Sequence, residues 1–438
     1  MSDERGAGPE EPEVPPGDEQ PEGPVVTAGE IAAQEIEAAR EREAEAFKMG
    51  LEAGFAQRLV EGITGTGVRV TILAFLSALV IGAFVIAFSE EPVQETLAYF
   101  LARPGDTFAA AWTAISDAYM ALLRGSLGGS RQLSETLVAA TPLILTGLAV
   151  AVALRGGLFN IGAEGQLIAG GITAGLVGFS FAGLPMLLHL PLAAAAGIAA
   201  GAFYGWIAGI LKAKTGAHEV ISTIMLNNIG MLVSTWLIST NVFRQPDRLD
   251  PISKPMEATA RFPRFVPDLR VNGALIMALA LAVVIFWLVE RSTHGFELNA
   301  VGLNPTAATV AGMDPKRTIV RAMTTGGALA GAAGAAVILG VHGRLTIGFS
   351  AGVGFDGITV ALLGRGRVGG TVMAGLLLGA LKAGGRSMQA VTGTSVDLVL
   401  VIQALIIVFI AAPGLVRAMF RIRAEELATG QVAKGWGT

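Results

Sequence analysis

The sequence predicts an all-α membrane protein, built as a polytopic bundle of about ten membrane-spanning helices. Of its 438 residues, 52% are hydrophobic and only 15% are charged, which excludes a soluble domain of this length. Several apolar runs approach the ~20 residues that a helix needs to cross ~30 Å of hydrocarbon. The chain has no Cys, so disulfides and thiolate ligands are excluded, and its four His show no ligand spacing. We therefore expect no metal site.

Residues 1–64 differ in composition from the rest and predict an acidic, largely disordered cytoplasmic tail. Up to Phe47 this tail holds fourteen acidic and three basic side chains, and six Pro lie within its first 24 residues. Such a stretch buries too little apolar surface to offset the entropy of ordering the chain. Residues 28–55 are rich in Ala and Glu, so we expect a surface helix there. A transmembrane domain over residues 65–413 and a cytoplasmic C-terminal tail over 414–438 complete the predicted organisation.

Apolar runs in chain order predict the individual spans. They are Val70–Phe88, Thr136–Leu154, Leu158–Ala182, His189–Leu211, Val220–Thr240, Val271–Val289, Ile319–Val341, a broken pair over Phe355–Leu381, and Val396–Pro413. Arg58 and Arg69 precede the first run, which favours a cytoplasmic amino end. The broken pair counts as two spans, so both termini are expected in the cytoplasm. The mixed, amphipathic segment Glu90–Gln132 is expected to lie along the outer surface.

Glycines spaced four residues apart predict close helix packing. They are Gly197, Gly201, Gly205 and Gly209, followed by the pairs Gly327 with Gly331 and Gly375 with Gly379. Helices in lipid are held together by close van der Waals contact, which small residues permit. A second glycine-rich stretch, Leu345–Gly357, is too interrupted for a regular span. Irregular backbone at membrane depth survives only against protein or a water-filled path, so we expect this stretch to be pore-lining or re-entrant.

The polar loop Arg291–Thr318 predicts a short exposed helix between two spans. Asn304 can cap a helix over Thr306–Met313, while Gly312 and the following Pro315 stop it. An ordinary loop with one helical turn is the alternative interpretation.

Apparent enzyme motifs fail on inspection. Gly348-Phe-Ser350-Ala-Gly352 fits a nucleophile elbow but lies in the glycine-rich stretch, with no strand before it. His218-Glu219 begins like a zinc-protease helix, yet Ser222 occupies the place of the second His. The chain has no phosphate-binding loop of the form Gly-x4-Gly-Lys-Ser/Thr. We therefore predict a protein that is not an enzyme, and any ATP must be bound by other subunits.

Four stretches together carry a resemblance to a known family. They are Arg155-Gly-Gly-Leu-Phe-Asn-Ile-Gly-Ala-Glu-Gly-Gln166, His218-Glu-Val-Ile-Ser-Thr-Ile-Met-Leu-Asn-Asn228, Gly302-Leu-Asn-Pro-Thr-Ala-Ala-Thr-Val-Ala-Gly312 and Gly354-Phe-Asp-Gly-Ile-Thr-Val-Ala-Leu-Leu-Gly364. In this order they resemble the membrane subunit of a nucleoside or simple-sugar importer of the ATP-binding cassette (ABC) class, related to ribose and branched-chain amino-acid permeases. The resemblance covers roughly Leu137–Pro413.

The resemblance implies a multi-pass permease of the plasma (inner) membrane that moves a nucleoside or simple sugar inward. It also implies several partners: two cytoplasmic ATP-binding subunits, a second permease subunit expected to be a paralogue, an extracellular substrate-binding lipoprotein, and membrane lipid. It implies neither a cofactor on this chain nor a nucleic acid polymer as partner.

The resemblance also suggests functional residues. Polar groups at membrane depth are costly unless they face a bundle interior or water. The expected substrate-path residues are Asn160, Glu164, Gln166, Asn227 and Asp356, with helix-to-helix hydrogen bonding as the alternative role. In the short helix, Ala307 and Ala308 followed by Gly312 resemble the loop of ABC importer permeases that docks on the ATPase, although Thr306 stands where that class often has Glu. The expected coupling residues are Asn304, Thr306, Ala307, Ala308 and Gly312, with Ala307 and Ala308 as the contact face.

The sequence leaves two other functions open. A proton-coupled secondary carrier would use Glu164 as its titrating group, and a passive channel would need no ATPase.

The distribution of positive charge conflicts with the expected topology. The loop 241–270 holds six basic residues and the loop 291–318 holds three. A count of positive charges therefore places loop 241–270 inside, whereas the family-like arrangement places it outside.

Overall fold

The computed structural model describes residues 66–420, except 247 and 249. The predicted acidic tail over residues 1–64 and most of the predicted C-terminal tail lie outside these residues. The chain divides into two units, Met1–Arg69 and Val70–Thr438. The second unit contains the helices that are apolar enough to cross a membrane.

Regular structure in the described part of the chain is helical, which confirms the all-α prediction for those residues. The helices are α3 (Thr66–Ser89), α4 (Glu91–Leu97), α5 (Pro104–Leu127), α6 (Ser130–Arg155), α7 (Ala163–Ser180), α8 (Met186–Thr215), α9 (Glu219–Ser239), the 3-10 helix η1 (Ala258–Ala260), α10 (Ala274–Arg291), α11 (Thr293–Leu303), α12 (Pro305–Val310), α13 (Pro315–Ala335), the π-helix η2 (Ala336–His342), α14 (Val353–Leu363), α15 (Val368–Thr392), α16 (Val396–Ala411) and α17 (Pro413–Met419). Extended pairing within residues 66–420 is limited to three isolated bridges.

Six helices among the described residues are long and apolar enough to cross a membrane: α6, α8, α9, α10, α13 continued by η2, and α15. A bent pair, Leu73–Ser89 with Glu91–Leu97, makes a seventh candidate with a bend of 73°. The helices of three other predicted spans, α7, α14 and α16, are not among them, and α14 has only 11 residues. Helix α7 begins with the polar Glu164 and Gln166, and α16 has only 16 residues. The count of ten spans stays a prediction.

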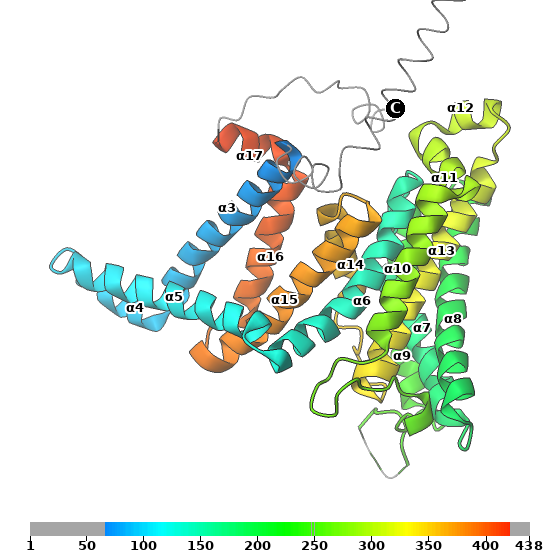
Figure 1. The fold of residues 1–438 in the computed structure, drawn as a ribbon, viewed down its shortest axis with the longest axis horizontal. Helices are drawn as coiled ribbons and strands as arrows, with labels where there is room; N and C mark the ends of the chain where they lie inside the picture. The colour runs from blue at the N-terminus through cyan, green and yellow to red at the C-terminus, as the bar shows by residue number, and fades with distance from the viewer. Residues whose placement is uncertain (1–65, 247, 249, 421–438) are drawn as a thin grey trace, which may run out of the picture. The chain divides into compact units, whose positions relative to one another are not determined.

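Helix α13 lies at the centre of the bundle, with α6, α7 and α8 packed around it (Figure 1). The glycines of α8 and α13 meet backbone to backbone. A Cβ on Gly201 would overlap the carbonyl oxygen of Gly327, and one on Gly331 would overlap that of Gly197. On a second helix pair, a Cβ on Gly379 would lie 2.7 Å from Ala140 of α6. The glycine spacing therefore predicted helix contact correctly.

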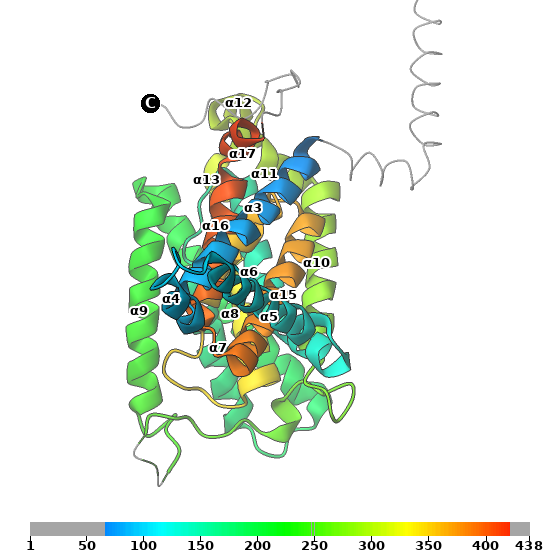
Figure 2. The same ribbon diagram turned by 90° about the vertical axis from the view of Figure 1, so that its left-hand side faces the viewer.

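Helix α5 is amphipathic, as its sequence predicts. It buries Ala118, Ala121 and Leu122, and it exposes Phe108 and Trp112. Its buried face packs against α15. Helix α9 packs against α7 and stands at the left edge of the view in Figure 2, with α10 at the right edge.

The glycine-rich stretch is irregular only in its first part. The backbone between η2 and α14 is non-helical, but Val353–Gly357 forms the start of α14, so the predicted limit at Gly357 was wrong. Gly354 and Gly357 do not break the helix. They let α14 approach its neighbours, since a Cβ on Gly357 would lie 2.7 Å from Thr146 of α6. The predicted break between α14 and α15 is confirmed at residues 364–367.

Glycine packing in the α8–α13 contact generates a test of stability. Replacing Gly201 by Val should lower the midpoint of thermal unfolding in detergent, because the new methyl groups have no space beside the backbone of α13. Overpacking typically costs about 1–3 kcal/mol. Gly369→Val is the matched control, because a Cβ at this exposed helical glycine meets nothing within 4 Å. An unchanged midpoint for Gly201→Val would contradict the close approach.

Candidate functional site

A short non-helical turn between α6 and α7 builds one side of the site. Helix α6 ends at Arg155, and Gly157 takes a left-handed backbone with φ 70°. The predicted span Leu158–Ala182 therefore began too early, since α7 starts only at Ala163. After the turn, the Asn160 side-chain oxygen accepts a hydrogen bond from the Gly162 N–H at 3.0 Å. This local bond leads the chain into α7.

Asn160 and Gln166 form a closed pair of amides. Asn160 Nδ2 donates to Gln166 Oε1 at 3.0 Å, and Gln166 Nε2 donates to Asn160 Oδ1 at 3.2 Å. Their side chains are 0% and 1% exposed. A buried amide needs such partners, because an unpaired polar group costs about 1–3 kcal/mol. The pair therefore stabilises the turn and leaves little hydrogen-bonding capacity for a ligand.

Asn227 and Glu164 connect α7 to two other helices. Asn227 of α9 accepts from the Gly165 N–H at 2.8 Å and donates to the Ile161 carbonyl at 2.9 Å. The Glu164 carboxylate accepts from the Gly354 N–H at 2.7 Å, at the amino end of α14. A carboxylate is favourable there, because the first N–H groups of a helix lack partners within it. Both side chains thus have structural roles.

Glu164 and Asn227 also line a small cavity of about 150 Å³. Its walls come from α7, α9, α14 and the irregular segment before α14. The lining residues are Glu164, Ile168, Asn227, Asn228, Met231, Ser234, Gly348, Phe349, Ser350 and Phe355.

Sequence reasoning missed several of these lining residues. Ser234 could have been found, because it lies seven residues after Asn227 and so on the same face of a helix. Phe349 and Ser350 depend on the path of the irregular backbone, which no helical period predicts. Asn160 and Gln166, which the sequence grouped with Glu164, do not reach the cavity lining.

Asp356 lies in a different setting, where it forms an ion pair with Lys382 of α15. Lys382 borders a second cavity, of about 300 Å³, together with Arg270, His342 and Arg386. Phe349 and Ser350 line both cavities. The irregular segment between η2 and α14 therefore separates the cavity next to Glu164 from a cavity bordered by the basic side chains of Arg270, Lys382 and Arg386.

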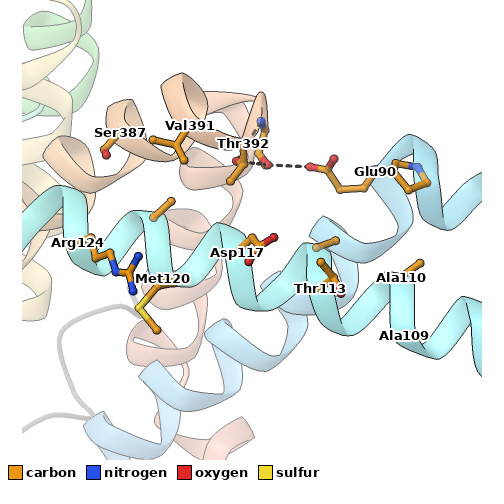
Figure 3. A pocket seen from close by; sticks show the side chains of 14 residues that line it. Glu90, Ala109, Ala110, Thr113, Asp117, Met120, Arg124, Ser387, Val391 and Thr392 are labelled. Carbon is orange, nitrogen blue, oxygen red and sulfur yellow. Dashed lines mark hydrogen bonds between the residues drawn. The ribbon is translucent and has the colours of Figure 1, made fainter.

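The largest cavity described, of about 740 Å³, lies elsewhere, between α5 and the turn from α15 to α16 (Figure 3). Asp117 and Arg124 of α5 line it, and Glu90 accepts a hydrogen bond there from Thr394 at 2.7 Å. It contains none of the residues that the sequence analysis selected.

The predicted short helix is present as α12, over Pro305–Val310 instead of Thr306–Met313. Asn304 caps it by accepting from the Ala307 N–H at 3.0 Å. The helix ends in a Schellman motif: Gly312 has φ 83°, and the Met313 N–H bonds to the Ala308 carbonyl at 3.0 Å. The last residues of the predicted helix, 311–313, therefore form the turn that ends α12 and are not part of the helix.

The exposed face of α12 differs from the predicted contact face. Ala308 is only 4% exposed and faces the protein, whereas Ala307 and Thr306 are exposed. The large apolar groups at the surface are Leu303, Val310 and Phe296, which are 71%, 87% and 66% exposed. Helix α12 lies beyond the ends of α10 and α13 (Figure 1). A partner could reach this face.

Comparison with known proteins gives consistent matches. Residues 132–411 match the profile of a family described as the permease component of branched-chain amino acid transport systems. The guanosine ABC transporter permease protein NupP of Bacillus subtilis is 42% identical over 305 residues, covering 69% of this chain and 87% of that protein. The nucleoside ABC transporter permease protein NupB of Lactococcus lactis is 37% identical, covering 73% and 89%. The glucose ABC transporter permease protein TsgB13 of Haloferax volcanii is 36% identical, covering 67% and 80%. No solved structure matches.

The closed amide pair predicts a non-additive double substitution. Asn160→Leu alone should lower stability by about 1–3 kcal/mol, because it leaves the Gln166 amide buried without its partner. Combining it with Gln166→Leu should cost less than the sum of the two single changes. Thermal unfolding in detergent measures all three variants, with Gln389→Leu on the exposed face of α15 as the control. Additive effects would show that the two amides act independently.

Proposed function

Because the chain belongs to the family of permease components of branched-chain amino acid transport systems, we propose that it carries nucleosides inward as the membrane subunit of an ABC importer. It is a permease subunit and not an ATPase. The similarity to nucleoside permeases over most of both chains carries the choice of substrate. A simple sugar is the second candidate, because the glucose permease is almost as similar.

The small cavity beside Glu164 is the proposed place where substrate passes this subunit. Glu164 and Asn227 line it, and Glu164 keeps one carboxylate oxygen for which no hydrogen bond is found in the described part of the chain. Asn160 and Gln166 support this place by fixing the turn before α7. Asp356, paired with Lys382, holds α14 to α15 on the far side of the irregular segment.

Helix α12 is the proposed contact for the cytoplasmic ATP-binding subunits, which would bind the ATP. Asn304 and Gly312 fix its two ends, and Ala308 holds it against the chain. The exposed Thr306, Ala307 and the large apolar Val310 would then form the contact surface. The exposure of apolar side chains supports this proposal, because no described residue covers the large apolar side chains on and beside α12.

The remaining organisation follows the family resemblance. Adding α3, α7, α14 and α16 to the six long apolar helices gives the ten proposed spans, with both termini cytoplasmic in the plasma membrane. A second permease subunit, expected to be a paralogue, would complete the path, and an extracellular lipoprotein would deliver the substrate. Loops 241–270 and 291–318 lie at opposite ends of α10, whose 18 residues extend about 27 Å. The two loops are therefore proposed to face opposite sides of the membrane.

Uptake of labelled substrate tests the proposed function. Cells without this gene should lose uptake of labelled guanosine or uridine, and the wild-type gene should restore it. Deleting the cognate ATP-binding subunit should abolish uptake as well, because that subunit supplies the energy. Labelled glucose tests the second candidate in the same cells. Nucleoside uptake that persists without the ATP-binding subunit would favour a proton-coupled carrier or a passive channel.

Val310→Asp tests the coupling surface. A charge in the centre of an interface should cost about 2 kcal/mol or more of binding free energy, which is about thirtyfold in affinity. The variant should therefore reach normal abundance but lose uptake and co-purification of the ATP-binding subunit. Val266→Asp is the matched control, because Val266 is an exposed valine in the loop at the other end of α10. Full retention of both properties in Val310→Asp would remove α12 from the contact.

Cysteine labelling tests the sidedness of the loops, since the native chain has no Cys. Asp268→Cys and Thr306→Cys replace exposed residues in the two loops. A membrane-impermeant maleimide should label Asp268→Cys on intact cells, and Thr306→Cys only after the membrane is opened. The reverse pattern would support the count of positive charges, which places loop 241–270 inside.

A further inference from the structure

The cavity of about 150 Å³ beside Glu164 is close in size to one ring system of a nucleoside and too small for a whole nucleoside. An engineered protein cavity of this volume binds one benzene molecule. A nucleoside consists of two ring systems, a planar base and a ribose. A cavity of this size holds one of the two ring systems at a time, and the chemistry of its walls decides which one fits better.

Two serines in the cavity wall have hydroxyls that make no hydrogen bond with the described residues. Ser234 and Ser350 are 5% and 6% exposed, and neither hydroxyl makes a hydrogen bond with the described residues. Other hydroxyls of α9 behave differently: those of Thr223 and Thr235 each donate to the carbonyl one turn earlier, at 2.7 and 3.0 Å. Neither serine oxygen is fully buried, since Thr107 Oγ1 is the one buried side-chain atom without a partner among the described residues. Both hydroxyls are therefore free to donate to, and accept from, a polar molecule that enters the cavity.

Two aromatic side chains form further walls. The Phe349 ring is 4% exposed and lies over Gly171 of α7, where a Cβ would be 2.6 Å from the ring. Phe355 projects from the first turn of α14 and is 47% exposed. The backbone around Phe349 is unusual, because the non-glycine residue Ala351 has φ 46°. Strained backbone of this kind clusters at functional sites.

We infer that this cavity receives the planar base of the nucleoside and that Phe349, Phe355, Ser234 and Ser350 set this preference. The inference rests on the proposed function. Every nucleobase has a π face that stacks on an aromatic side chain. Each serine hydroxyl can both donate and accept, so it can serve either kind of group on the edge of a base. A ribose is not planar, so it would use the hydroxyls but would not stack fully on the aromatic walls.

Substitutions at the walls separate a binding role from a structural one. Phe355→Leu should weaken the apparent affinity for labelled guanosine about tenfold, through loss of stacking, at normal protein abundance. Phe355→Tyr keeps the ring and should restore most of it. Ser234→Ala should also lower uptake, whereas Thr235→Ala, whose hydroxyl is bonded within α9, is the matched control. Equal uptake in Phe355→Leu and Phe355→Tyr would overturn the aromatic role.

Photolabelling of the complete importer identifies which ring enters the cavity. 8-Azidoguanosine carries its reactive group on the base, and a guanosine with a diazirine at the ribose 5′ oxygen carries it on the sugar. The azide probe should label peptides from residues 224–239 or 343–363, and the diazirine probe should label other peptides. Labelling of these peptides by the ribose probe alone would overturn the inference. No labelling by either probe, while the wild type still takes up guanosine, would also overturn it. Absence of any nucleoside uptake by the wild type would instead overturn the proposed function, and this inference with it.

Discussion

Close backbone contact between α8 and α13 holds the helical bundle together. In lipid, apolar side chains gain little by turning toward one another, so helices associate through packing and internal hydrogen bonds. Gly201 and Gly327 have no side chains that would hold the two backbones apart. Helix α7 approaches the same helix in the same way, since a Cβ on Gly334 would overlap the Leu167 carbonyl. A central α13 surrounded by α6, α7 and α8 follows from this.

The polar groups of the site connect further helices to this closely packed bundle. Asn227 ties the start of α7 to α9, and Glu164 ties it to α14. These bonds leave a small polar cavity beside an irregular segment that could not exist in contact with lipid. Phe349 lies where this segment separates that cavity from the one bordered by cations. Structural and ligand-binding roles therefore overlap in the same few residues.

Helix α13 also connects the two regions that the proposed function requires. It begins after the α12 turn, and through η2 it leads into the irregular segment that lines the cavity. The chain thus runs without a break from the proposed ATPase contact to the proposed substrate path. Small residues pack α13 closely against α6, α7 and α8 along this path.

From the amino-acid sequence we could predict the helical membrane class, the glycine contacts, the cap at Asn304 and the stop at Gly312. These features are local or periodic: a cap needs one side chain near the first N–H groups, and a glycine ridge needs only a spacing of four. Other features follow from the packing of helices that are distant in the sequence. This packing buried Ala308 and left Val310 exposed, it enclosed Asn160 and Gln166 in a closed pair, and it brought Ser234, Phe349 and Phe355 to one cavity. Those outcomes depend on which helix packs against which, and on the path of the irregular backbone between Gly343 and Gly352. This segment has no helical or strand periodicity from which its path could be predicted.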